Sequence, residues 1–247
     1  KALDFNMVLK DASAYNIQFH KGRATLIDTL SFDMYEEGSP WVAYRQFCQH
    51  FLAPLALMAH TDVRLSQLLR ISIDGVPLDL ASKLLPGKTR WNLGLSTHLH
   101  LHARMQQQNA GKAVDASKAR GRITKTGFLG LIENLEGTVR GLSWKPAGTE
   151  WADYYEITNY SDAAFEAKRA LVAAFIAEAK PQTLWDLGGN NGEFSRVASE
   201  QGIYTVSADI DPAAVEQNYR SLRTRKEKNL LPLVMDLTNP SPDLGWS

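Results

Sequence analysis

Three aspartates and one glycine-rich turn are the residues of this sequence best suited to hold a ligand. Asp186, Asp209 and Asp236 each come at the end of a short apolar run, and the turn Gly-Gly-Asn-Asn-Gly (188–192) follows the first of these runs. Carboxylates accept hydrogen bonds from hydroxyl and amine groups. A glycine turn lets the backbone approach a ligand and directs the N–H groups of a following helix toward it. The pattern therefore predicts a binding site for a polar ligand.

A parallel sheet would bring these residues together. Between residues 161 and 236 the sequence predicts helices over 161–179, 193–201 and 212–225 and strands over 183–187, 204–208 and 230–236. Ser161 is typical of an N-cap, Lys180-Pro181 ends the first helix and Asp211-Pro212 begins the third. The order β-α-β-α-β predicts an α/β fold with a parallel sheet and right-handed crossovers. Ligands bind outside the carboxyl ends of such strands, where the three aspartates would face one crevice.

The spacing of the glycine turn distinguishes two classes of cofactor. The nicotinamide dinucleotide motif, G-x-G-x-x-G, fails in both frames. Read from Gly188, Asn190 and Glu193 stand where glycines belong, and read from Gly189, Asn191 and Phe194 do. Residues 186–195 instead resemble motif I of the class I S-adenosylmethionine-dependent methyltransferases, D-x-G-x-G-x-G, with Asn190 at the middle glycine. Residues 208–212 and 234–237 resemble motifs II and III of that family.

This resemblance implies S-adenosyl-L-methionine as the cofactor. Asp209, 23 positions after Asp186, would accept the ribose hydroxyls, and Asp236 would accept the adenine amine. Ile210 and Leu237 would lie on the two sides of the adenine ring, and Asp186 or the loop carbonyls would suit the ammonium group. The expected cofactor-binding residues are Asp186, Gly188, Gly189, Asn190, Gly192, Asp209, Ile210, Asp236 and Leu237.

The resemblance also implies in-line methyl transfer, catalysed mainly by proximity and orientation. In this superfamily the acceptor-side residues usually follow a fourth strand, and the sequence reaches Ser247 without one. We therefore expect a fragment with a truncated Rossmann-like sheet. Such a fragment would methylate nothing and would bind cofactor weakly if at all. No catalytic base is assigned, and a small molecule, a glycan and RNA all stay open as methyl acceptor.

The composition is that of an ordinary soluble globular protein. Of the 247 residues 44% are hydrophobic, and 27 Lys and Arg balance 27 Asp and Glu, so no DNA or membrane partner is implied. The single cysteine, Cys48, and the lack of a membrane-length apolar run favour a cytoplasmic protein. The expected regions are a mainly helical region (1–105), a polar linker (106–126), a helical extension (127–180) and the N-terminal half of a methyltransferase domain (181–247).

The first region carries a partial match to kinase catalytic loops. Asp11 and Asn16 have the spacing of H-x-D-x-x-x-x-N in kinases and aminoglycoside phosphotransferases, and Asp28 falls where the metal-binding aspartate of D-F-G would follow. Leu9 replaces the histidine, and Thr29-Leu30 replaces Phe-Gly. A degenerate kinase-like C-lobe and a simple Asp-capped turn beside an ordinary strand both stay open.

Alternating histidines raise the question of a metal. His98, His100 and His102 would share one face of a strand, whereas on a helix only His98 and His102 would do so. No third type of ligand lies nearby in the sequence, so we expect packed or surface histidines and no metal site.

Taken whole, the chain resembles a bacterial family described as S-adenosylmethionine-dependent methyltransferases, some of them nodulation host-specificity proteins. The segments that carry the resemblance are 10–17, 40–47, 73–78 and the motif I segment. The leading hypothesis is an enzyme that transfers a methyl group in its full-length form. The alternative is a non-catalytic binding or scaffold protein with a degenerate kinase-like lobe.

Overall fold

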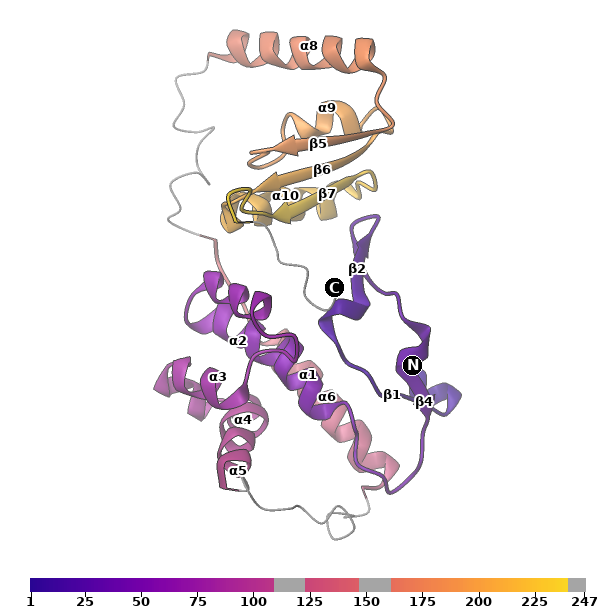
Figure 1. Cartoon of the computed structure of the whole chain (residues 1–247), viewed down its shortest axis with the longest axis vertical. Helices are drawn as coiled ribbons and strands as arrows, with labels where there is room; N and C mark the ends of the chain where they lie inside the picture. Colours follow the sequence, from indigo (N-terminus) through magenta and orange to yellow (C-terminus); the bar gives the residue numbers. More distant parts are fainter. Residues whose placement is uncertain (109–122, 147–160, 240–247) are drawn as a thin grey trace. The chain divides into compact units, whose positions relative to one another are not determined.

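The computed structural model describes residues 1–108, 123–146 and 161–239 (Figure 1). Within these ranges the chain forms two compact units. The first contains residues 1–17, 26–108 and 123–144, and the second contains residues 18–25, 145–146 and 161–239. No helix among the described residues combines the length and the apolar character needed to cross a membrane.

The first unit is mainly helical, as predicted. Its strands β1 (Met7–Leu9) and β4 (Phe32–Met34) pair antiparallel. Strands β2 (Ile17–His20) and β3 (Arg23–Leu26) pair with each other, and their residues 18–25 belong to the second unit. The α-helices are α1 (Tyr44–Phe47), α2 (Ala53–His60), α3 (Leu78–Leu84), α4 (Leu93–Leu95), α5 (His102–Gln108) and α6 (Lys125–Arg140). Five 3-10 helices (Ala2–Phe5, Ala14–Asn16, Thr29–Ser31, Val63–Arg70, Gly87–Trp91) and two π-helical segments (Cys48–Leu52, Ser96–Leu101) complete the described part of this unit.

One core holds these helices together and includes α6. Leu52, Leu57, Leu95 and Leu99 are fully buried in it, and Leu135 of α6 packs among them. The first unit therefore extends to residue 144. This differs from the expected helical extension over 127–180, because the apolar side of α6 is buried in the first core. Residues 109–122 of the expected linker lie outside the described part of the chain.

The sequence predicts a helix over 41–58 that is interrupted at Pro54, and the structure shows no interruption there. Helix α1, the π-helical segment Cys48–Leu52 and α2 follow one another without an interruption. Proline has no N–H to donate within a helix, and a wider π turn is one way for a helix to accommodate it. The carbonyl of Gln49 in that turn accepts the N–H of Val76 at 2.9 Å, so it is satisfied from outside the helix.

The second unit confirms the predicted alternation of helices and strands. Its elements are α8 (Asp162–Ala179), β5 (Thr183–Leu187), α9 (Ser195–Ser199), β6 (Tyr204–Asp209), α10 (Pro212–Arg225) and β7 (Leu230–Val234). The three strands are parallel and lie in the order β5-β6-β7. The bounds differ in two places, since α9 is shorter than the predicted helix over 193–201 and β7 ends at Val234 instead of Asp236.

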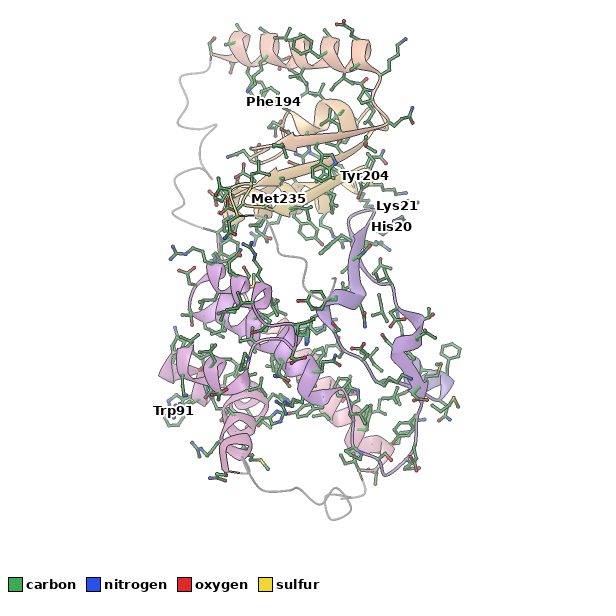
Figure 2. All side chains as sticks on the ribbon, in the orientation of Figure 1. His20, Lys21, Trp91, Phe194, Tyr204 and Met235 are labelled. Carbon is green, nitrogen blue, oxygen red and sulfur yellow. The ribbon has the colours of Figure 1, made fainter. Side chains whose placement is uncertain are left out.

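Local hydrogen bonds explain where these helices begin and end. Ser161 accepts the N–H of Ala164 at 3.3 Å, and Asp211 accepts the N–H of Ala213 at 2.8 Å, so both act as the predicted N-caps. Lys180 ends α8 in the left-handed conformation with φ of 47°. Figure 2 shows Phe194, just before α9, between α8 and the sheet, where its ring lies 5.1 Å from that of Phe165.

Candidate functional site

Backbone hydrogen bonds tie the turn between β5 and α9 to the neighbouring strand. The N–H groups of Gly188 and Gly189 both donate to the carbonyl of Ala208, at 2.8 and 3.0 Å. Gly188 and Gly192 have φ of +83°, and Asn190 has φ of +47°. Asparagine tolerates this left-handed region better than most residues. Asn190 can therefore replace the middle glycine of the motif without changing the hand of the turn.

At two glycines of the turn, neighbouring atoms leave no space for a side chain, whereas a third glycine borders open space. A Cβ atom on Gly189 would overlap the hydroxyl of Ser207, and one on Gly192 would overlap the side-chain amide of Asn218. A Cβ atom on Gly188 would meet no atom within 4 Å. The backbone at Gly188 is thus the part of the turn that a ligand can approach.

The carboxylate of Asp209 is bound to the turn. Its Oδ2 accepts the N–H of Asn190 at 2.8 Å, and its Oδ1 accepts the N–H of Asp211 at 2.9 Å. An ionised carboxylate has about four positions for accepting hydrogen bonds, so about two are left for further donors. The side chain is only partly buried. Asp209 can therefore accept two neighbouring hydroxyl groups of a ligand that lies on the turn.

Asp186 lies on the other side of the same turn. It is the second-last residue of β5, and its Oδ2 accepts the hydroxyl of Ser195 at 2.6 Å. A Cβ atom on Gly189 would lie 3.3 Å from this oxygen. Ser195 is fully buried, and because its one hydroxyl proton is given to Asp186, its oxygen accepts the hydroxyl of Ser207 at 2.9 Å. The structure thus brings Asp186 and Asp209 to the backbone of residues 189–190, with Asp186 also fixing the start of α9.

Asp236 is less directly connected to the turn. It lies two residues beyond the end of β7, which corrects the expectation that it ends the third strand. Its Oδ1 accepts the N–H and the hydroxyl of Thr238 at 2.9 and 2.7 Å. The reason is that β-type pairing finishes just before it, where Met235 N–H donates to the carbonyl of Asp209 at 2.8 Å. This pairing still places the segment beside the end of β6.

Two apolar side chains flank the carboxylates. Ile210 follows Asp209 and Leu237 follows Asp236, and they are 60% and 54% exposed. Large apolar side chains beside a few polar groups are typical of sites for ring-containing ligands. Their role on the two sides of an adenine ring stays a prediction.

A buried ion pair holds the turn from the protein interior. Arg196 of α9 donates from Nε and Nη2 to the carboxylate of Glu227, at 3.0 and 3.2 Å, and its side chain is 2% exposed. Its Nη1 donates to the carbonyl of Asn191 at 2.9 Å, and its Nη2 donates to Oδ1 of Asn218 at 3.0 Å. One guanidinium therefore links the turn to α10 and to the segment before β7.

Sequence reasoning missed this pair because neither residue belongs to a motif. The sequence contains only a weak indication that these two residues form a pair. An arginine stands inside the short helix 195–199, four residues after the last glycine of the turn, and Glu227 stands between two lysines. The bond joins residues that are 31 positions apart, so the local sequence pattern does not predict it.

The kinase-like residues of the first unit are only partly brought together. The side-chain amide of Asn16 donates to the hydroxyl of Ser31 at 2.9 Å, and this hydroxyl donates to Asp28 at 2.8 Å. Asp11 instead accepts the side-chain amide of Gln46 at 2.7 Å. Ser31 is 1% exposed, so the hydroxyl that joins Asn16 to Asp28 is buried in the protein.

The alternating histidines lie on helical turns and enter two separate networks. His98 contacts the hydroxyl of Tyr44 and the side-chain oxygen of Asn134, both at 2.7 Å. His100 contacts the hydroxyls of Ser82 and Thr89, at 2.8 and 2.9 Å. Burial lowers the pKa of both rings, which favours their neutral forms. Across residues 1–108, 123–146 and 161–239, no three His, Cys, Asp or Glu side chains are grouped as a metal site requires.

Comparison with curated proteins finds a similar chain. Over 249 aligned residues the sequence is 36% identical to nodulation protein NoeA of Rhizobium meliloti (strain 1021). The alignment covers 99% of this chain and 52% of that protein, so the chain spans about half the length of its relative. Neither a protein-family model nor a solved structure matches the chain. The similarity agrees with the nodulation part of the resemblance seen in the sequence, and the relative's name gives no reaction.

Proposed function

We propose that the second unit is the cofactor-binding half of a Rossmann-like, S-adenosylmethionine-dependent methyltransferase, and that the protein is related to nodulation as its relative is. One observation carries the proposal. The carboxylate at the end of β6 accepts the N–H of Asn190, the left-handed residue in the middle of the glycine-rich turn after β5. The turn and the carboxylate are therefore a single assembly at the carboxyl ends of two parallel strands.

The residues of this assembly suit an adenosyl ligand. Asp209 keeps capacity for the two ribose hydroxyls, the space at Gly188 admits a ligand to the backbone, and Ile210 is exposed beside the carboxylate. The turn lacks the second and third glycines that a dinucleotide pyrophosphate requires. A nucleoside without a pyrophosphate is consequently the better fit.

When bound, the cofactor would supply an electrophilic methyl group on a sulfonium. The role of the chain itself is to bind and orient. Asp209, held against the turn by the N–H of Asn190, would hold the ribose, and the ion pair of Arg196 with Glu227 keeps the carbonyl of Asn191 in place. Orientation of this kind supplies much of the rate in a transfer between two bound groups.

The proposal is tested by titrating S-adenosylhomocysteine into isotopically labelled chain 1–247 and following amide shifts by NMR, a method that detects weak binding. We expect the amides of residues 188–192 and 209–211 to shift. In Asp209→Asn the shifts should be lost, because the NH2 group that replaces one oxygen can accept neither the ribose hydroxyls nor the N–H of Asn190 or Asp211. Asp79→Asn removes an exposed carboxylate of the first unit and should leave the shifts unchanged.

Two outcomes would contradict the proposal. One is the absence of any shift at the highest soluble concentration of S-adenosylhomocysteine while the spectrum shows a folded second unit. The other is an equal set of shifts with a nicotinamide dinucleotide, since the turn would then not discriminate between the two ligand classes.

A second candidate function rests on the first unit. The buried hydroxyl of Ser31 connects Asn16 with Asp28, so these two groups already have partners within the protein. Such a pair favours a degenerate kinase-like lobe that serves as a scaffold. Magnesium with an ATP analogue should then leave the amide shifts of residues 11–17 and 26–31 unchanged, and saturable shifts there would contradict the scaffold.

A further inference from the structure

A hairpin from early in the chain is held against helix α10 by specific contacts. Residues 18–25 of this hairpin belong to the second unit, as α10 does. Nη1 of Arg223 donates to the carbonyl of Gly22 at 3.2 Å, and the rings of Phe19 and Tyr219 meet edge to face with their centres 6.0 Å apart. The hairpin and the C-terminal half of α10 therefore form one surface.

This surface is hollowed at the C-terminal end of α10. The hollow has a volume of about 540 Å³, and sites for small-molecule ligands are typically about 300–1,000 Å³. Figure 2 shows His20 and Lys21, which line the hollow from the hairpin. Residues 226–228, which line it from the other side, join α10 to the amino end of β7. The hollow is thus separate from the turn 188–192, which lies at the carboxyl ends of the strands.

Cationic side chains line the hollow from both segments. Lys21 and Arg23 come from the hairpin, and the exposed residues Arg223, Lys226 and Lys228 come from the end of α10 and the segment after it. Apart from Arg223, none of these five side chains has an ion-pair or hydrogen-bond partner within the part of the chain that the structure describes. Four cations of the hollow are therefore available to a ligand.

The one acidic side chain among the described residues that line the hollow is already compensated. Glu227 accepts hydrogen bonds from Nε and Nη2 of the buried Arg196, at 3.0 and 3.2 Å. Arg225 also approaches this carboxylate at 3.8 Å. The negative charge of Glu227 consequently does not offset the surface cations. A hollow with uncompensated charge of one sign raises the local concentration of ligands of the opposite sign.

Two of the lysines occupy backbone positions that suit other residues better. Lys21 has φ of +50° in the turn of the hairpin, and Lys226 has φ of +58° directly after α10. Glycine and asparagine adopt this left-handed region at a lower cost and are common in such turns and after helices. Lys180 has the same conformation after α8, so the conformation alone marks no site. The distinctive feature of Lys21 and Lys226 is that both line one hollow.

We propose that this hollow binds a ligand that carries two or more neighbouring phosphate groups, such as pyrophosphate or a nucleoside diphosphate. Lysine and arginine are the side chains that bind phosphate oxygens. A phosphate group carries a charge of about −1.5 to −2 at neutral pH, so two of them match the four available cations. The cations surround a hollow of small-molecule size, which favours a small ligand over an RNA strand in a long groove. The proposal does not rest on the methyltransferase assignment.

The test titrates inorganic pyrophosphate into isotopically labelled chain 1–247 at constant ionic strength, without S-adenosylhomocysteine, and follows the amides by NMR. We expect saturable shifts at residues 20–23 and 226–228. Adenosine diphosphate should shift the same amides, and adenosine should shift none of them. Tighter binding of adenosine diphosphate than of pyrophosphate would identify the ligand as a nucleotide, and equal binding would restrict recognition to the phosphates.

Substitution of the left-handed lysines separates charge from structure. Lys21→Asn with Lys226→Asn should weaken pyrophosphate binding at least about tenfold, because half of the available cations are removed. Asparagine tolerates the left-handed region, so hydrogen exchange of β6 should stay as slow as in the unchanged chain. The matched control is Lys180→Asn, the same change at an exposed left-handed lysine outside the hollow, which should leave binding unchanged. Lys228→Gln, at a residue that is not left-handed, should also weaken binding.

The absence of saturable shifts with pyrophosphate would overturn the proposal. Equal affinity for sulfate at the same ionic strength would overturn it too, because the hollow would then be only a positive surface. The same holds for unchanged binding in the lysine variants, and for binding of a single-stranded RNA oligonucleotide without binding of pyrophosphate. These readouts do not involve residues 209–211 or S-adenosylhomocysteine, so this proposal and the proposed function can fail independently.

Discussion

The ion pair under the glycine turn provides the sharpest test of how the second unit is stabilised. The perturbation is Glu227→Gln, which keeps the shape and one acceptor oxygen but removes the negative charge. Arg196 would keep its positive charge in a place where its side chain is 2% exposed. A buried charge without its counter-charge is one of the few changes that destabilise a protein strongly.

The magnitude follows from the geometry. At 3.0 Å and an effective dielectric constant of about 20, the gross attraction of two unit charges is about 5 kcal/mol. The glutamine keeps part of the hydrogen bonding, and Asn191 and Asn218 still accept from the guanidinium. We therefore expect the free energy of unfolding of the second unit to fall by about 3 kcal/mol.

The assay must follow the second unit alone, because a chain of two units does not unfold in a single step. Native-state hydrogen exchange of the buried amides of β6 reports this unit. The matched control is Glu216→Gln, which breaks the exposed pair of Glu216 with Arg220, at 2.7 Å within α10. That change should cost at most about 0.5 kcal/mol. The double variant Arg196→Met with Glu227→Gln should recover part of the loss, because no charge is then left unpaired.

The reasoning would be refuted if Glu227→Gln and Glu216→Gln lowered the stability by the same small amount. It would also be refuted if moderate salt removed the effect of Glu227→Gln, because salt screens exposed pairs far more than buried ones.

Three further predictions concern buried and left-handed residues. Burial raises the pKa of the Cys48 thiol to about 12, so a thiol reagent at mildly alkaline pH should react far more slowly with the folded protein than with the unfolded one. Burial lowers the pKa of His98, so the stability of the first unit should be full above the ordinary histidine pKa of about 6.5 and should fall as pH drops below it, measured by hydrogen exchange in α6. Gly188→Ala should cost about 1 kcal/mol of left-handed strain, and Gly192→Ala should cost more because its Cβ also overlaps Asn218, measured by hydrogen exchange in β6.

The order of elements in the second unit could be predicted because local signals mark its boundaries. Asp211 caps α10 directly before Pro212, and Lys180 ends α8 before Pro181. Each signal acts within one turn of the chain, so it can be recognised without knowing the tertiary structure. The π-helical segment Cys48–Leu52 and the continuation of the helix through Pro54 in α2 could not be predicted, because they depend on burial in a core made from distant segments.

The candidate site shows the same division between local and distant causes. The positions of Asp186 and Asp209 follow from strand ends, which the apolar pattern reveals. The bond of Asp209 to Asn190 and the role of Arg196 depend on side chains that meet across the fold. Asp236 departs from the expectation because the pairing of β7 ends before it, and its carboxylate accepts hydrogen bonds from Thr238 instead.

The contacts of the turn also indicate how a ligand would bind. The backbone of residues 188–191 is held by hydrogen bonds to Ala208, Asp209 and Arg196. A preformed turn does not have to be ordered on binding, so little binding free energy is lost there. Weak binding by chain 1–247 would then reflect missing contacts elsewhere. S-adenosylhomocysteine should accordingly shift the same amides of residues 188–192 in chain 1–247 and in a chimera in which this chain replaces the matched part of the rhizobial relative, with only the affinity differing. A different set of shifted amides in the chimera would show that the turn is rebuilt, contrary to its hydrogen bonding here.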